Sequence, residues 1–390
     1  MTKVKISFTP YGGVKRKSFS AQIGLAVSKL TETCKGKNLF YLYHGGVIDQ
    51  ELLNLSNLVI SSENIEVNKD IVVIKDSLLI SEGSVINISE GGKLRILFDP
   101  KSHNNALFVT DACNNYCIMC PQPPKPTISL GIKEYLINII DLIRNEDSPE
   151  TLGITGGEPT VINKDLIDVI IRINEKFPNT IIQLLSNGRI FAYQDYTKAM
   201  SAVSSNMFIG IPIFGATSEI HDFIVQSKGA FNQTIAGIYE CRRNKIDIEL
   251  RVVLHKYTIK ELELIIQFIK RTLPFVNHVA LMGMENMGFA KMNYNDLWID
   301  PIEYKDTLRH AVIDLNRAGI STSIFNLPFC VLASDIWGFS KQSISDYKTN
   351  YLKQCNECIK RDDCAGLFSS TNDKFRLTKP ENINLIKDII

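Results

Sequence analysis

Two patterns of apolar residues divide the sequence near residue 100. Before that point, short β-branched runs alternate with turns rich in Glu, Asn, Ser and Gly, which predicts a small β-rich domain over residues 1–100. The expected strands are residues 58–60, 71–74, 78–80, 85–88 and 94–97, and the expected helices are residues 20–30 and 50–55.

From residue 106 onward, apolar runs alternate with amphipathic stretches. The expected strands are residues 106–110, 151–155, 180–185, 207–213, 246–254 and 275–282, and the helices between them are residues 132–145, 163–177, 192–204, 230–244 and 258–272. Such alternation is typical of an α/β fold with a parallel sheet and right-handed crossovers. In parallel α/β barrels the functional groups gather at the carboxyl ends of the strands, so we looked there for chemistry.

Three cysteines follow the first of these strands. Cys113, Cys117 and Cys120 lie within eight residues, and the prolines that come next prevent a helix or strand from continuing. A structural zinc site uses four protein ligands. A [4Fe–4S] cubane held by three thiolates instead leaves one iron open to another ligand. The pattern favours the cluster, and the alternative is a zinc knuckle completed by a distant residue such as His103.

The later strand ends carry candidate ligand-binding residues. The second strand is followed by Gly156, Gly157, Glu158 and Pro159, and the third by Ser186 and Asn187. We expect the glycines to allow close approach of a ligand to the backbone. Arg251 lies in the fifth strand. An interior-facing guanidinium there would need an anionic partner such as a ligand carboxylate, whereas an outward-facing one would form a salt bridge.

The C-x3-C-x2-C spacing, with Gly-Gly-Glu-Pro about 35 residues later, resembles the two signature motifs of radical SAM enzymes. The resemblance implies a partial (β/α)6 barrel over residues 101–300, a [4Fe–4S] cluster on the three cysteines and S-adenosylmethionine bound at the open iron. It also implies reductive cleavage of S-adenosylmethionine to a 5′-deoxyadenosyl radical, with an electron from a reductant such as ferredoxin or flavodoxin. Met119 stands where many members carry an aromatic residue near the adenine, and its polarizable sulfur can pack against a purine.

A second set of cysteines lies in residues 301–390, after an expected helix at 301–319 and a strand at 321–326. Cys330, Cys355, Cys358 and Cys364 are a complete set of four thiolates, which by count alone suits zinc. Their arrangement resembles the auxiliary-cluster region (twitch type, related to SPASM) of peptide-modifying radical SAM enzymes. That resemblance implies a second, auxiliary [4Fe–4S] cluster.

Longer stretches resemble the HxsC branch of the His-Xaa-Ser system radical SAM maturases. These stretches are residues 107–110, 117–125, 279–285, 297–301, 327–332 and 344–348. The resemblance implies a ribosomally made precursor peptide with His-Xaa-Ser repeats as substrate, a second maturase similar to HxsB as partner, and hydrogen abstraction followed by cross-linking. A radical SAM oxidoreductase acting on another protein or small molecule, and a zinc-binding interaction protein, are the alternatives. We assign no catalytic residue, although Tyr257, Met284 and Glu285 lie at predicted strand ends.

Composition limits the partners that this chain could have. The chain has 390 residues, and 43 Lys and Arg balance 42 Asp and Glu, which leaves no charge block suited to nucleic acid. No apolar run approaches the ~18 residues of a membrane span, and residues 1–16 lack the apolar core of a signal peptide. Nine cysteines in such a chain favour metal binding over disulfides. We therefore expect a cytoplasmic protein with no nucleic-acid or membrane partner.

Overall fold

The computed structural model describes residues 7–9, 22–62, 65, 67–73, 80–89, 94–203, 206–342, 349–372, 374–383 and 386. The predicted segment at 344–348 and most of the one at 78–80 lie outside these residues. Contact density divides the chain into two units. The first comprises Met1–Phe108, Leu130–Gly153 and Lys164–Ile182, and the second comprises Val109–Ser129, Ile154–Asn163 and Gln183–Ile390.

The amino-terminal part of the first unit is a seven-stranded sheet with the order β1-β5-β4-β3-β2-β6-β7. Its strands are β1 Ser7–Thr9, β2 Gln22–Val27, β3 Leu39–Tyr43, β4 Leu58–Ser61, β5 Asp70–Val73, β6 Val85–Ile88 and β7 Leu94–Phe98. Strands β2 to β5 are parallel neighbours, and β1, β6 and β7 pair antiparallel. The predicted β-rich character is therefore confirmed, as is the helix at 50–55, which is α1 Gln50–Leu55 and begins at an Asp49 cap.

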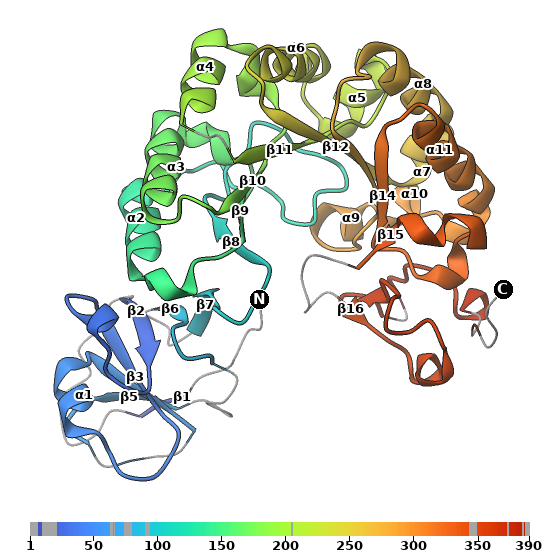
Figure 1. Ribbon diagram of the computed structural model, residues 1–390. Coiled ribbons are helices and arrows are strands. Elements are labelled where there is room, and N and C mark those ends of the chain that lie inside the picture. The colour runs from blue at the N-terminus through green and yellow to red at the C-terminus, as the bar shows by residue number, and fades with distance from the viewer. Residues whose placement is uncertain are drawn as a thin grey trace. The chain divides into compact units, whose positions relative to one another are not determined.

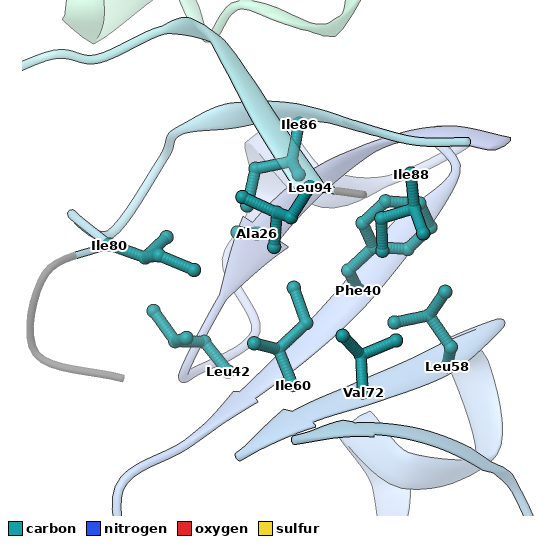
Figure 2. Packing of buried hydrophobic residues seen from close by; sticks show 10 residues of the cluster. All are labelled: Ala26, Phe40, Leu42, Leu58, Ile60, Val72, Ile80, Ile86, Ile88 and Leu94. Atoms are coloured by element: carbon teal, nitrogen blue, oxygen red, sulfur yellow. The ribbon is translucent and has the colours of Figure 1, made fainter. Parts of the chain in front are cut away.

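Buried aliphatic and aromatic side chains point toward one another between the strands of this sheet (Figure 2). The predicted helix at 20–30 is wrong, because residues 22–27 form β2, paired with β3 and β6. Gly24 explains part of this result: a Cβ at that position would lie 2.6 Å from the ring of Phe40, so β2 packs closely against a large core side chain. Pairing and burial here outweigh the helix propensity of the Leu and Ala in the same stretch.

The second sheet has eight strands that follow one another in sequence order, from β8 to β15. They are β8 Asn105–Phe108, β9 Thr151–Thr155, β10 Ile181–Leu185, β11 Met207–Pro212, β12 Asp247–Leu254, β13 His278–Gly283, β14 Ser321–Phe325 and β15 Ser340–Lys341. The pairs from β11 to β15 are parallel. The predicted α/β class with a parallel sheet is confirmed. β14 and the short β15 extend the sheet beyond the six strands expected before residue 300.

Helices α4, α5, α6, α8 and α11 of the second unit lie along one side of its strands (Figure 1). The helices that follow the amino-terminal domain are α2 Ile132–Leu142, α3 Lys164–Lys176, α4 Gln194–Ala202, α5 Ser218–Val225, α6 Ala230–Arg243, α7 Lys256–Lys260, α8 Leu262–Thr272, α9 Gly288–Met292, α10 Tyr294–Leu297 and α11 Lys305–Arg317. α8 shows why they pack this way, because Leu262, Ile265, Ile266 and Ile269 form one buried stripe. The predicted helix at 258–272 is two helices, and α5 occupies a stretch expected to be loop.

The carboxyl-terminal segment of residues 374–382 is fastened to the rest of the second unit by Asp300. This carboxylate is fully buried and accepts hydrogen bonds from Thr378 Oγ1 at 2.7 Å, Lys379 N at 2.8 Å and Asn382 Nδ2 at 3.1 Å. Just before this segment, β16 Thr349–Asn350 pairs antiparallel with β17 Leu367–Phe368. No helix in the described ranges combines the length and apolar character that crossing a membrane requires.

Candidate functional site

The loop that follows β8, residues 109–125, carries the first three predicted ligands and is called the cysteine loop below. Cys113, Cys117 and Cys120 are free thiols that are partly exposed. Burial raises the pKa of Cys113 to about 11, against a hydrogen bond from Asn115 N that lowers it, and burial also raises the pKa values of Cys117 and Cys120. These thiols are therefore protonated at neutral pH, and a metal that binds them must displace their protons.

Helices α5 and α9 of the same unit hold the cysteine loop in place. Two backbone amides of the loop donate to carbonyl oxygens at the end of α5. One loop carbonyl accepts a hydrogen bond from a backbone amide of α9, and a second loop carbonyl accepts one from the side chain of the residue that follows α9. The bonds are Tyr116 N to Val225 O, Ile118 N to Ile224 O, Phe289 N to Cys120 O and Asn293 Nδ2 to Ile118 O, all at 2.8–3.0 Å. The shape of the loop thus depends on residues more than 100 positions away.

The Gly-Gly turn after β9 packs directly on the start of the cysteine loop. Gly157 N donates to Thr110 O at 2.7 Å, and Glu158 N donates to Ala112 O at 2.8 Å. A Cβ on Gly157 would lie 2.4 Å from Ala112 O, and one on Gly156, whose φ is +153°, would lie 2.5 Å from Thr110 O. The atoms that lie close to these two glycines in the structure are backbone atoms of the cysteine loop. The two predicted motifs therefore form one hydrogen-bonded unit.

Glu158 joins this unit to the end of β10. The side chain is 1% exposed, and burial raises its pKa against the hydrogen bonds that lower it. Its Oε1 accepts from Thr160 N, Thr160 Oγ1 and Ser186 Oγ, and its Oε2 accepts from Asn187 N at 2.6 Å. Pro159 is the first residue of the short 3-10 helix that Glu158 caps. The structure thus brings the Gly156–Pro159 turn together with Ser186 and Asn187, and contact of Glu158 with a ligand stays a prediction.

Arg189, directly after this strand end, is a residue of the site that the sequence reasoning missed. Its Nη1 donates to Asn114 O at 2.7 Å and to Asn115 Oδ1 at 2.6 Å, both in the cysteine loop. Asn187 Nδ2 donates to the same segment, at Asn114 Oδ1. These partners are more than 70 positions apart in sequence, so no local pattern reports them. The available signal was its position after the polar Ser186-Asn187-Gly188 strand end.

Met119 lies in an apolar cluster beside the thiols. It is 5% exposed, and Cys117, Ile118 and Tyr257 pack against the same cluster. The buried members are Met119, Phe214, Ile224, Val225, Ala230, Met284, Ala290 and Leu297. Cys117 therefore has mostly apolar surroundings, and the predicted contact of Met119 with a purine is not tested by this packing.

Arg251 lies on the same face of β12 as Val253, which packs against the Met119 cluster. This placement is the interior-facing one of the two alternatives. Its anionic partner is Glu249, whose Oε1 accepts from Arg251 Nε at 2.7 Å. The network continues through His278, whose Nδ1 lies 2.9 Å from Glu249 Oε2 and whose Nε2 lies 3.0 Å from Ser323 Oγ. Binding of a ligand carboxylate by Arg251 stays a prediction.

The second set of cysteines converges on a single cavity. Cys330, Cys355, Cys358 and Cys364 all line it, together with apolar side chains such as Phe329 and Leu367. Burial raises the pKa of Cys364, against a hydrogen bond that its Sγ accepts from Gly366 N at 3.4 Å. The residues brought together are the ones that the sequence predicted as a ligand set.

The thiols of both cysteine sets are the type of ligand that iron–sulfur clusters use. Within the described residues, no three His, Cys, Asp or Glu side chains lie close enough together to share one metal ion. His103, the alternative zinc ligand, is exposed in the first unit.

Comparison with known proteins agrees with this geometry. Residues 107–269 match the radical SAM superfamily, whose members are enzymes that use a [4Fe–4S] cluster and S-adenosylmethionine. The chain is similar to a cysteine-type anaerobic sulfatase-maturating enzyme of Clostridium novyi, at 27% identity over 46% of this chain and 48% of that protein. It is also similar to an Fe-coproporphyrin III synthase of Methanosarcina barkeri, at 26% identity over 42% of this chain and 39% of that protein.

Solved structures with a similar fold include one determined with a bound peptide. The native anSMEcpe structure with bound AdoMet and the Kp18Cys peptide superposes with a TM-score of 0.51 and 14% identity, over 72% of this chain and 92% of that one. The present chain spans less than half the length of the two relatives named above.

Proposed function

We propose that this chain, which carries a radical SAM superfamily domain at residues 107–269, is an enzyme that modifies a ribosomally made precursor peptide. With a cluster on Cys113, Cys117 and Cys120 and S-adenosylmethionine bound, the site would supply a 5′-deoxyadenosyl radical that takes a hydrogen atom from the peptide. The expected product is a cross-link within or between residues of that peptide.

A single observation carries the proposal: the cysteine loop and the Gly156–Pro159 turn are hydrogen-bonded to each other beside the end of β10. Three thiols on one loop can hold three irons of a cubane and leave the fourth open. In this proposal Gly156, Gly157, Pro159, Ser186 and Asn187 shape the pocket for S-adenosylmethionine. Glu158 orients that pocket or accepts from the ammonium group, Met119 lies against the adenine and Arg251 donates to the carboxylate.

The four remaining ligands support a second part of the proposal. Cys330, Cys355, Cys358 and Cys364 would hold an auxiliary [4Fe–4S] cluster that accepts an electron or anchors the substrate. The corresponding organisation is a β-rich domain at 1–100, a radical SAM barrel at 101–300 and an auxiliary region at 301–390. The nine free thiols suit a reducing compartment, and we propose the cytoplasm.

The proposed substrate is a more specific claim than the proposed radical chemistry. A peptide substrate is supported by the protein of similar fold, which was solved with AdoMet and a peptide. The sequence resemblance to the HxsC branch points to a precursor with His-Xaa-Ser repeats, and to a second maturase similar to HxsB as partner. Ferredoxin or flavodoxin is the proposed reductant, and we propose no nucleic-acid or membrane partner.

The first experiment tests the two clusters without any substrate. The protein is reconstituted anaerobically with iron and sulfide, and iron per chain and reductive cleavage of S-adenosylmethionine are measured. We expect about eight irons, falling to about four with loss of 5′-deoxyadenosine in the triple variant Cys113→Ala/Cys117→Ala/Cys120→Ala. Stoichiometric zinc in place of iron would instead support a binding protein without catalysis. A fully loaded protein that cleaves no S-adenosylmethionine would refute the enzyme.

The second experiment tests the substrate. A synthetic peptide with His-Xaa-Ser repeats is incubated with loaded enzyme, reductant and S-adenosylmethionine, and its mass is compared with that of a peptide in which each His is replaced by Ala. A cross-link removes two hydrogen atoms, so the mass should fall by that amount for the His peptide only. The same incubation with a sulfatase peptide carrying a Cys tests the second candidate, a maturase of sulfatases, which the Clostridium relative favours.

A further inference from the structure

The Arg189 side chain connects four segments of the second unit. It leaves the end of β10, reaches the cysteine loop at Asn114 and Asn115, and also contacts the α5–α6 turn and α6. Its Nη1 donates to Ser227 Oγ at 2.9 Å, and its Nε donates to Gln233 Oε1 at 2.7 Å. No other side chain of the site described above joins so many of the segments that surround the three thiols.

The two residues that Arg189 holds, Asn114 and Asn115, are two of the three that separate Cys113 from Cys117. Asn115 is 4% exposed, and its side-chain oxygen is fixed by the guanidinium at 2.6 Å. The segment is therefore fastened from two sides: by Arg189 at residues 114 and 115, and by the end of α5 at the amides of Tyr116 and Ile118. The distance between Cys113 and Cys117 depends on the conformation of this short segment.

Arg189 also brings a permanent positive charge to the site. A guanidinium does not lose its proton in proteins, and it donates several hydrogen bonds in a fixed planar arrangement. The guanidinium is hydrogen-bonded to Asn114, the residue next to Cys113. A cluster on three thiolates is anionic, and its reduction potential depends on the net charge and hydrogen bonds around it.

We propose that Arg189 is a positioning residue that sets the spacing of Cys113 and Cys117 and holds a fixed positive charge beside the cluster they bind. This inference rests on the proposed cluster on the cysteine loop. It assigns two separable effects to one side chain: the hydrogen bonds fix the loop, and the charge favours the reduced cluster. Lysine at this position would keep the charge and lose most of the hydrogen bonds, whereas glutamine would lose the charge as well.

Three variants of the full-length, anaerobically reconstituted protein separate these effects: Arg189→Gln, Arg189→Lys and Asn115→Ala. The control is Arg172→Gln, which removes a partly exposed arginine of α3 paired with Asp141 and Glu175 in the first unit. Three quantities are measured for each variant. The first is the iron content per chain, and the second is the reduction potential of the cluster whose EPR signal changes on addition of S-adenosylmethionine. The third is the hydrogen-exchange rate of the backbone amides of Tyr116 and Ile118.

We expect Arg189→Gln to shift that potential to more negative values and to speed exchange at both amides about tenfold or more, because charged hydrogen bonds to the loop are lost. In Arg189→Lys the reduction potential should stay close to that of the unsubstituted protein, while both amides exchange faster. Asn115→Ala should show the same two results. Arg172→Gln should change neither quantity. If Arg189→Gln cannot retain the cluster, iron should fall from about eight to about four per chain, because the auxiliary cysteines are untouched.

Two results would overturn the inference. One is an Arg189→Gln variant with unchanged iron, potential and amide exchange. The other is an Arg189→Lys variant whose potential falls as far as that of Arg189→Gln, which would remove the role of the charge. An unsubstituted protein that binds no iron would instead refute the proposed function itself, so the two failures are distinguishable. If Arg189→Gln does not fold, Arg189→Lys and Asn115→Ala decide the role in the loop.

Discussion

Replacing Gly157 by alanine should separate the two motifs of the proposed site without changing any ligand. Gly157 donates to Thr110 O at 2.7 Å, and the next amide, of Glu158, donates to Ala112 O at 2.8 Å. An alanine Cβ would lie 2.4 Å from Ala112 O and 2.7 Å from Asp111 O. Both obstructing atoms are backbone atoms, so the new methyl group fits only if the cysteine loop moves away from the turn.

The cost follows from what that movement breaks. Two backbone hydrogen bonds contribute about 1 kcal/mol each, and forcing a methyl group into packed structure costs about 1–3 kcal/mol, which gives about 3–5 kcal/mol in total. Domains are typically stable by about 5–15 kcal/mol, so the variant should still fold. Its cysteine loop, however, should lose the geometry that the cluster needs. We therefore expect iron to fall from about eight to about four per chain, and formation of 5′-deoxyadenosine to cease.

The assay is iron and sulfide per chain after anaerobic reconstitution, with the urea midpoint measured on the same preparation. Gly338→Ala is the matched control, because a Cβ at that position would meet no atom within 4 Å. It should keep its iron and change stability by no more than about 0.5 kcal/mol. If Gly157→Ala retains about eight irons and cleaves S-adenosylmethionine at the normal rate, the two motifs do not depend on each other, and the reasoning is wrong.

Three further variants and modifications test other parts of the structure. Asp300→Ala should lower the free energy of unfolding by about 3–5 kcal/mol, because Thr378, Lys379 and Asn382 lose a buried charged acceptor. The free energy is measured by urea unfolding, and a decrease of less than about 0.5 kcal/mol would contradict this expectation. Burial lowers the pKa of His255 to about 3, from an ordinary 6.5. As pH falls, this histidine therefore takes up a proton in the unfolded state before it does so in the folded state. The free energy of unfolding should fall by about 2 kcal/mol between pH 7 and 5 as a result. His255→Leu should show a correspondingly smaller loss over that range, and an equal loss in both proteins would exclude His255 as its source. Burial raises the pKa of the Cys113 thiol from 9.0 to about 11. In the metal-free protein at pH 8, this thiol should therefore react with iodoacetamide about 100-fold more slowly than glutathione does. Its rate should rise about tenfold with each pH unit up to pH 11. A rate that does not depend on pH would show that another group controls the reaction.

Long periodic segments were predictable from the sequence, and short or ambiguous ones were not. β12 Asp247–Leu254 and α3 Lys164–Lys176 lie where the pattern placed them, because their apolar spacing fits one structure only. β2 was mistaken for a helix because its strand character comes from pairing with β3 and β6. α5 was missed because it is a single short helix after a strand end.

For the site, the roles of the predicted residues stay predictions, and the structure shows which protein atoms surround them. The seven cysteines predicted as ligands do gather in two sets, on the cysteine loop and around one cavity. Gly156 and Gly157 were expected to make room for a ligand, yet the atoms that require them to be glycine are Thr110 O and Ala112 O. A single sequence cannot distinguish these causes, because both demand a residue without a Cβ.

The hydrogen bonds around the cysteine loop explain why its sequence motif is not sufficient by itself. Three thiols at the right spacing bind a cubane only if the loop presents them to one centre. Here that presentation depends on the Gly157 turn, on Arg189 and on the ends of α5 and α9. Arg189 and the ends of α5 and α9 are contributed by residues that no motif contains. The loss of any one should therefore affect the cluster on the cysteine loop while leaving the four-cysteine set loaded, a selectivity that a general loss of stability would not produce.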